Sequence, residues 1–305
     1  MSIASRNASP TQSRHTISWL LLIIANILWA SSYVAAKFAL QETSVVLMLA
    51  LRMVISALIL LPMIIIRRKE LKLTWKDLPQ LIVLVLVGFV INKLLEFGGL
   101  ALTTASDVAL LITGESIFTA AWAWILLHEP FKKKTAIALL IGFLGVYLIV
   151  ERSLWPNLPA GGGAGRMIGD LLVVVALLIE SFYTIQGKAL LVKHSPLLIT
   201  AASIVGSVVF WLPVAGWELF TRGPQPISLL TWLSIGWLAL MATVIAYLAW
   251  FKGLMQVDGT RAASTLFIQP LLGTILAVVL LQDQLSPLTI IGGLLIIVSV
   301  YLISR

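Results

Sequence analysis

Five ionisable residues lie inside otherwise apolar stretches of this 305-residue chain: Arg52, Lys93, Glu96, Glu115 and Glu180. A charged residue at the centre of a membrane helix costs about 2.5–3.5 kcal/mol on insertion scales, so such residues normally pair, face other helices or line a watery cavity. A buried carboxylate without a partner readily binds a proton or a cationic group. Glu115 and Glu180 are therefore candidates for proton coupling or for binding a substrate ammonium group.

Each of these residues also has a structural interpretation. Lys93 and Glu96 are three residues apart on one helix face, and a local salt bridge explains both. Arg52 can brace the helix bundle by donating to carbonyl groups or to a carboxylate, leaving Glu115 or Glu180 simply protonated. If all five are ionised, the sum is two positive and three negative charges, which suits a proton, an ammonium group or a zwitterion better than an anion.

Aromatic side chains in the same stretches can stack on an aromatic or cationic ligand. Most are expected to serve packing or the membrane interface. Four share helices related to those of the ionisable residues and are candidate cavity residues: Trp29, Tyr33, Tyr183 and Tyr247. Gln269, in the ninth apolar stretch, completes the set of candidate substrate-binding or proton-coupling residues.

The composition shows what kind of element carries these residues. Hydrophobic residues make up 60% of the chain and charged residues 11%, against roughly a quarter charged in a soluble domain. Apolar stretches of about 17–23 residues, the length needed to cross about 30 Å of hydrocarbon, recur along the chain. We predict an all-α membrane protein with ten transmembrane helices, at residues 17–39, 45–66, 78–102, 107–127, 134–150, 168–190, 197–218, 231–252, 262–281 and 287–303.

The basic residues indicate orientation. A net charge of +8 alone could suggest nucleic acid, but these residues gather in short loops between apolar stretches, so a nucleic-acid partner is not expected. Ten spans place both termini on one side, and fifteen basic residues fall on that side, against three in the opposite loops: Arg152, Arg166 and Arg222. The positive-inside rule then predicts a multi-pass protein of the cytoplasmic (inner or plasma) membrane, with both termini cytoplasmic.

An internal repeat divides the chain. A Gly- and Pro-rich linker at 151–167, predicted to be external, separates a first five-helix repeat at 17–150, preceded by a cytoplasmic tail at 1–16, from a second at 168–305. Lys37 matches Lys188 at an offset of 151 residues, and the stretch 97–100 matches 251–254 at an offset of 154. Because five is odd, the second repeat enters the membrane from the opposite side. Inverted repeats are typical of transporters, whose substrate site lies near the midplane between them.

These residues resemble the EamA-type branch of the drug/metabolite transporter superfamily. The likeness covers nearly the whole chain and is carried by Trp29-Ala30-Ser31-Ser32-Tyr33 with Lys37, by Arg52, by Leu126-Leu127-His128-Glu129-Pro130 with Gly142 and Gly145, and by Gln269-Pro270, Leu280-Leu281-Gln282-Asp283 and Gly292-Gly293. The resemblance implies two five-helix repeats and export of amino acids, other metabolites or cationic drugs. This chain departs from the family at Glu115-Ser116, where a Pro is usual, and the two repeats differ where Glu180 corresponds to Trp29.

Enzyme chemistry finds no support in the sequence. The chain has no cysteine, and His15, His128 and His194 lack metal-binding spacing. The glycines at 161–163 carry no Walker residues. We therefore expect no catalytic residue, no metal and no cofactor.

The prediction is a secondary transporter, an exporter of amino acids or related small amphipathic metabolites by alternating access in the lipid bilayer, with proton coupling as one version. The first alternative is efflux of aromatic or cationic drugs. A nucleotide-sugar or phosphate-ester exchanger should present a basic cavity, which the surplus of carboxylates argues against. A membrane-embedded enzyme or a structural assembly protein is a further alternative. The sequence makes no prediction of oligomeric state.

Overall fold

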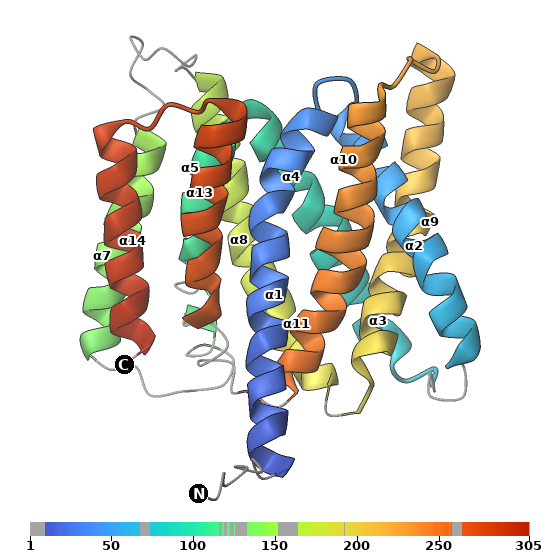
Figure 1. Cartoon of the computed structure of the whole chain (residues 1–305), viewed down its shortest axis with the longest axis horizontal. Helices are drawn as coiled ribbons and strands as arrows, with labels where there is room; N and C mark the ends of the chain where they lie inside the picture. The colour runs from blue at the N-terminus through green and yellow to red at the C-terminus, as the bar shows by residue number, and fades with distance from the viewer. Residues whose placement is uncertain are drawn as a thin grey trace, which may run out of the picture.

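The computed structural model describes residues 10–67, 74–115, 118, 121–122, 125, 133–151, 164–191, 193–255, 257 and 264–304. Within these ranges every regular element is a helix (Figure 1), as an α membrane protein requires. Parts of several predictions lie outside the described residues: the tail at 1–9, most of the linker, Ser116, the stretch 126–130 and the glycines at 161–163.

The first half of the chain forms helices close to the predicted ones. Their bounds are α1 Pro10–Ala39, α2 Val45–Ile66, α3 Leu78–Val85, η1 Leu86–Ile91, α4 Asn92–Leu102, α5 Ala105–Leu111, η2 Ile112–Gly114 and α7 Lys133–Glu151. The segments α3, η1 and α4 form one continuous span from Leu78 to Leu102. Beyond residue 115, the predicted span at 107–127 lies mostly outside the described residues.

The second half repeats this order of helices. Its bounds are α8 Ala164–Leu190, α9 Pro196–Arg222, α10 Leu229–Ala239, η4 Leu240–Ile245, α11 Ala246–Leu254, η5 Ser264–Phe267, α13 Ile268–Leu281 and α14 Pro287–Ser304. Across the described residues, six helices are long and apolar enough to cross a membrane, and α7, α13 and α14 contain shorter apolar stretches. The chain is thus a multi-pass α-helical membrane protein.

Serine caps fix where equivalent helices begin. The Ser44 hydroxyl accepts the Leu47 N–H at the start of α2, and the Ser195 hydroxyl accepts the Leu198 N–H at the start of α9. A serine at this position satisfies a helix N–H that has no partner within the helix. The two caps are separated by the offset of 151 residues already seen between Lys37 and Lys188.

Two π-helical segments interrupt the described helices, one in the third span of each half. They are η1 and η4, which begin at Leu86 and Leu240, 154 residues apart, the second offset of the internal repeat. Apolar periodicity gives no warning of a π turn, so the sequence predicted uninterrupted helices here. Such wide turns are frequent at functional sites.

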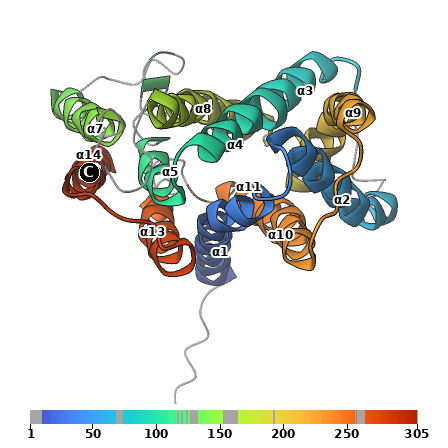
Figure 2. The same ribbon diagram turned by 90° about the horizontal axis from the view of Figure 1, so that it is seen from above.

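Helices from the two halves pack against one another (Figure 2). α4 contacts α8, α2 contacts α9, and α1 contacts both α11 and α13, while α7 and α14 form a pair at one edge of the bundle. Small residues allow the closest approaches. A Cβ atom on Gly99 would lie 2.5 Å from the Gly169 carbonyl oxygen, and one on Gly145 would lie 2.6 Å from that of Gly292.

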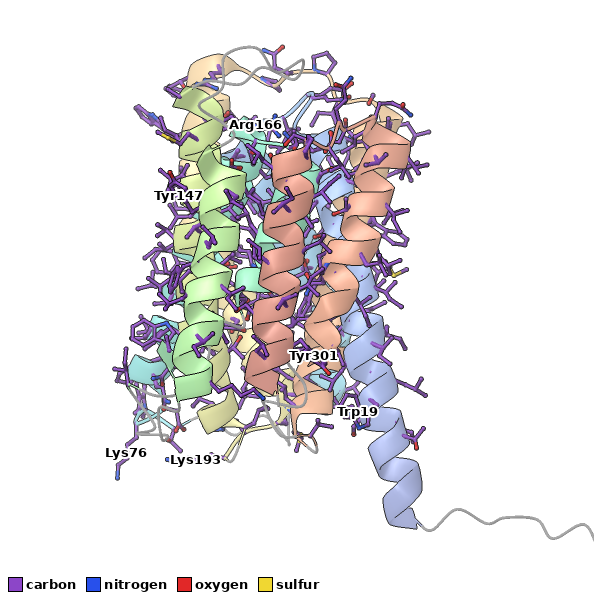
Figure 3. All side chains as sticks on the ribbon, turned by 90° about the vertical axis from the view of Figure 1, so that its left-hand side faces the viewer. Trp19, Lys76, Tyr147, Arg166, Lys193 and Tyr301 are labelled. Carbon is purple, nitrogen blue, oxygen red and sulfur yellow. The ribbon has the colours of Figure 1, made fainter. Side chains whose placement is uncertain are left out.

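Basic residues lie at both ends of the bundle. Lys76 and Lys193 lie at the end where α1 begins, and Arg166 lies at the opposite end (Figure 3). At the first end, the Thr74 hydroxyl and N–H donate to the Asp77 carboxylate over 2.6 and 3.0 Å, which holds the pKa of that carboxyl below its usual range. α14 also ends there (Figure 1), so α1 begins and α14 ends on the same side of the bundle.

Candidate functional site

A cavity lies in the middle of the bundle, between α1, α2, α4, η2, α8, α11 and α13. The structure brings all ten predicted site residues to it: Trp29, Tyr33, Arg52, Lys93, Glu96, Glu115, Glu180, Tyr183, Tyr247 and Gln269. Its volume open to water-sized molecules is about 40 Å³. One water needs roughly 10–15 Å³ by this measure, so the described conformation has room for only a few waters.

Helix spacing explains why α4 contributes so much of the lining. Two adjacent pairs of residues follow η1 on α4: Asn92 with Lys93, and Glu96 with Phe97. The pairs lie about one helical turn apart, so all four residues share one face of α4. All four are buried and line the cavity. On α11, directly after η4, Tyr247 and Trp250 share a face in the same way.

Lys93 is the centre of a buried ionic group. Its Nζ atom lies 2.6 Å from Glu96 Oε2 on the same helix and 3.3 Å from Glu180 Oε2 on α8. The local salt bridge between Lys93 and Glu96 is therefore confirmed, and it extends to a second helix. With all three ionised, this group carries one positive and two negative charges.

Arg52 is held by contacts other than an ion pair. Its Nε atom donates to Thr243 Oγ1 over 2.7 Å, and its guanidinium lies 5.0 Å from the centre of the Phe97 ring. The arginine is 2% exposed. Within the described part of the chain its Nη1 atom has no hydrogen-bond partner, and neither Glu115 nor Glu180 forms an ion pair with it.

Glu115 is the most weakly bound carboxylate of the cavity. It is 7% exposed, and its Oε1 atom lies 3.4 Å from the Thr184 hydroxyl, a long hydrogen bond. Its backbone carbonyl accepts from the Ser181 hydroxyl over 3.0 Å, which fixes the position of the residue against α8. Among the residues that the structure describes, Glu115 has no ion-pair partner. The side chain therefore retains capacity to bind a proton or a cation.

Aromatic rings form one wall of the cavity. Trp29 packs against Tyr247 and Trp250, with ring centres 5.2 and 5.3 Å apart. The indole N–H of Trp29 donates to the Ala242 carbonyl in η4 over 3.0 Å, which fixes the ring. Lys93 lies 5.9 Å from the centre of the Tyr247 ring, so the aromatic wall and the ionic group are adjacent.

An amide network places Gln269. Its Nε2 atom donates to Asn26 Oδ1 over 2.7 Å, and Asn26 Nδ2 in turn donates to Thr265 Oγ1 over 2.8 Å. The network joins α1 to the start of α13. Asn26 was not among the sequence candidates, although a buried amide in an apolar stretch is a usable signal.

The sequence reasoning missed several further lining residues: Ser32, Asn92, Phe97, Ile112, Ala176, Leu177, Thr184, Trp250 and Leu266. Two of them carried a signal. Asn92 precedes Lys93 in the middle of an apolar stretch, and Trp250 is three residues after Tyr247. The apolar lining residues are indistinguishable in sequence from lipid-facing ones.

A second group of buried charges lies at the end of the bundle that carries Arg166; we call it the end cluster, made of Lys37, Thr103, Asp107, Arg166 and Asp170. Arg166 forms an ion pair with Asp107. The Thr103 hydroxyl donates to Asp170 over 2.5 Å, and Lys37 donates to the Thr103 carbonyl over 2.5 Å. A lysine near the end of a membrane helix ordinarily extends towards the headgroups, but Lys37 instead joins α1 to the turn after α4.

Metal-binding groupings are not a feature of the described ranges, where no three His, Cys, Asp or Glu side chains are arranged as ligands. His194, at the start of the second helix of the second half, lies 3.3 Å from Asp77. His128 lies outside the described residues.

The cavity offers binding groups of three kinds: carboxylates, one arginine with a free donor, and aromatic faces.

The chain is similar to known transporters over nearly all of its length. A protein of Archaeoglobus fulgidus described as an uncharacterized transporter is 28% identical, over 93% of this chain and 96% of its own. The S-adenosylmethionine/S-adenosylhomocysteine transporter of Chlamydia trachomatis is 26% identical, over 88% and 83%. A solved crystal structure matches with a TM-score of 0.66 at 19% identity, covering 94% and 96%, which shows the fold alone.

The family comparison matches both halves. The EamA-like transporter family is matched at residues 16–151 and again at residues 167–305. The same residues that suggested this resemblance in the sequence, from Trp29 to Gly293, fall within the two matched stretches. The protein belongs to the EamA-like transporter family, within the drug/metabolite transporter superfamily.

Proposed function

We propose that this member of the family is a secondary transporter that exports amino acids or related small amphipathic metabolites, with Glu115 and Glu180 binding a proton or a substrate ammonium group. The observation that carries the proposal is the shared cavity. Residues from both halves, with three carboxylates, two cations and an aromatic wall, meet in the middle of an apolar bundle. Buried charges at such a depth normally mark a substrate or ion pathway.

The proposed architecture is ten transmembrane helices in two inverted five-helix repeats, at 17–150 and 168–305, joined by an external linker at 151–167. Three observations support it. The family is matched separately in each half, the π segments η1 and η4 share one offset, and the serine caps of α2 and α9 share the other. The proposed mechanism is alternating access, because a site of a few waters must open to admit a metabolite.

The proposed location is the cytoplasmic membrane with both termini cytoplasmic, and the proposed direction is export. The basic residues of the loops support this orientation. Lys76 and Lys193 lie at the end where α1 begins (Figure 3), as the proposal requires. The proposed direction of transport rests on the resemblance to a family of exporters. In a secondary transporter, the net direction is set by the gradients of the substrate and of any coupled proton.

A second candidate is efflux of aromatic cations. The packed rings of Trp29, Tyr247 and Trp250 beside a surplus of carboxylates favour it, because a cation over an aromatic face is attracted by the ring electrons. The Chlamydia relatives are named for S-adenosylmethionine and S-adenosylhomocysteine, which combine an amino acid with an adenine ring. These two compounds therefore belong in any substrate panel for this protein.

The test is flux in proteoliposomes with and without an imposed pH gradient. The panel contains amino acids, S-adenosylmethionine and aromatic cations, and wild type is compared with Glu115→Gln. We expect amino-acid flux that the pH gradient stimulates in wild type and whose stimulation falls at least about fivefold in Glu115→Gln. The matched control is Glu42→Gln, which neutralises a carboxylate in the exposed turn after α1, away from the cavity.

Each other outcome selects a different function. Flux of aromatic cations without amino-acid flux would establish the second candidate. Amino-acid flux that is independent of pH and unchanged in Glu115→Gln would make the protein a facilitator and Glu115 a structural residue. Silence of wild type towards the whole panel would contradict both transport proposals.

A further inference from the structure

Arg52 is a charged cavity residue whose hydrogen-bonding capacity is only partly used. A guanidinium carries five N–H donors. Nε is engaged by Thr243, whose own hydroxyl donates to the Leu238 carbonyl over 2.8 Å and is therefore oriented to accept from Arg52. Nη1 is buried and has no partner within the described part of the chain. A buried charged donor without a partner is unfavourable, so a purely structural role leaves this atom unexplained.

Lys93, the other cation of the cavity, has ion-pair partners and in this respect differs from Arg52. Lys93 contacts two carboxylates, Glu96 and Glu180, and lies over the Tyr247 ring. Both carboxylates thus contact Lys93, and in the described part of the chain neither forms an ion pair with Arg52. The guanidinium lies against the Phe97 ring, and Arg52 is part of the cavity lining.

We propose that Arg52 binds the carboxylate of the transported molecule, while Glu115 receives its ammonium group, so that the substrates are α-amino acids rather than amines or esters. This inference rests on the proposed function and narrows its substrate class. A guanidinium matches a carboxylate through two parallel hydrogen bonds, and Glu115 is the carboxylate without an ion-pair partner among the described residues. The Thr243 bond holds Arg52 ready for this contact.

The charges of the cavity agree with a zwitterion. The five ionisable residues sum to one net negative charge when all are ionised. A zwitterion leaves this sum unchanged while it satisfies one free donor and one free acceptor. A simple amine would neutralise the surplus but leave Arg52 without a partner, and a simple acid would satisfy Arg52 but double the surplus.

The test compares three compounds on the wild-type protein: the amino acid with the highest flux, its methyl ester and its decarboxylated amine. We expect the ester and the amine to be transported about tenfold to a hundredfold more slowly at equal concentration, since each lacks the group that bonds a charged donor. The same order is expected when the three compounds compete against the labelled amino acid. This arm needs no variant and is independent of folding.

Variants identify the residue responsible. Arg52→Gln should slow the amino acid to the rate of its ester while leaving the ester rate within a factor of about two, and Arg52→Lys should keep part of the preference. Thr243→Val is the matched control, because it removes the bracing bond and retains the guanidinium; it should keep the preference for the amino acid at a lower overall rate.

Two results would overturn the inference while the proposed function stands. One is equal flux of the amino acid and its ester in wild type. The other is a uniform loss of flux for all three compounds in Arg52→Gln, with the preference for the amino acid retained in that variant. If wild type transports the amine or other organic cations and no amino acid, the proposed substrate class fails and the inference fails with it.

Discussion

The molecule contains two groups of buried charges, which differ in how fully their hydrogen-bond donors and acceptors are bonded within the protein. In the end cluster, Arg166 pairs with Asp107, Asp170 accepts from Thr103, and the lysine donates to a carbonyl. In the central cavity, as far as the described residues show, Arg52 keeps an unbonded Nη1 atom and Glu115 has only one long side-chain hydrogen bond. Most of the charged residues in both groups are buried, so burial alone does not separate them.

This difference in bonding distinguishes charges with a structural role from charges that can bind a ligand. A charge that is fully paired inside the protein contributes to conformational definition and gains nothing from a ligand. A charge with unused bonds gains a partner when a ligand arrives, so the free donors and acceptors of the cavity are the features that a substrate can satisfy. A pocket beside the end cluster, lined by Lys37 and Asp283 among others, has a volume of about 480 Å³, yet its charged residues already have protein partners.

The largest expected effect comes from breaking the ion pair of the end cluster. Arg166→Ala leaves Asp107 charged, buried and without its cation, which costs about 3–5 kcal/mol of stability. The measurement is thermal unfolding of the purified protein in detergent. Substrate selectivity among the folded molecules should stay as in wild type, because the pair lies outside the cavity.

A double variant serves as the control for this prediction. Arg166→Met with Asp107→Leu removes both charges, and replacement of a buried ion pair by apolar residues is often neutral or stabilising. Most of the lost stability should therefore return. If the double variant is as unstable as Arg166→Ala, the pair does not act as a unit and the contrast between the two groups is wrong.

The next effect concerns the helix contact beneath the end cluster. Gly99 of α4 packs tightly against Gly169 of α8. In sequence, Gly169 stands between Arg166 and Asp170 of the end cluster. Gly99→Ala should cost about 1–3 kcal/mol through overpacking, measured by thermal unfolding. The matched control is Gly98→Ala, because a Cβ there meets nothing within 4 Å; it should stay within about 1 kcal/mol of wild type. Equal effects of the two substitutions would refute the contact.

The smallest effect is expected at an exposed carboxylate of the same end. The Ser228 N–H donates to Glu42 over 2.8 Å, and this bond lowers the pKa of Glu42 below its ordinary value of about 4.3. Its contribution to stability is therefore present above that value and is lost as the pH falls through the lowered pKa. Glu42→Ala should lower Tm slightly at pH 7, and its difference from wild type should shrink as the pH falls through the lowered pKa, with Gln41→Ala as control. A difference that does not change with pH would show that charge is not its cause.

Ten of the nineteen residues that line the cavity were candidates from the sequence, and the ionisable ones among them carried one strong signal. An ionisable or polar side chain in an apolar stretch is costly in lipid, so residues such as Glu115 and Glu180 mark the interior without any knowledge of packing. For the six described helices that are long and apolar enough to cross a membrane, the positions also followed from apolar length. These two inferences depend only on local composition.

The end cluster and the π turns could not be predicted in the same way. Arg166 and Asp107 are 59 residues apart, and at the ends of their helices they look like ordinary loop residues. The wide turns at η1 and η4 depend on tertiary contacts: the carbonyl of Phe89 accepts the Trp211 indole N–H over 3.1 Å, as that of Ala242 accepts the Trp29 indole. Such partners are set by the packed bundle rather than by neighbouring residues.

The interlocking of the two halves also has a consequence for synthesis. Arg52 meets Thr243 across 191 residues of chain, and Asn26 meets Thr265 across 239. At about 5–20 residues per second, Thr243 is made roughly 10–40 s after Arg52. During that interval the newly made first half holds a charged side chain and an amide whose final partners do not yet exist. The chain must therefore keep these groups away from lipid until the second half arrives, and this waiting period is when misassembly is most to be expected.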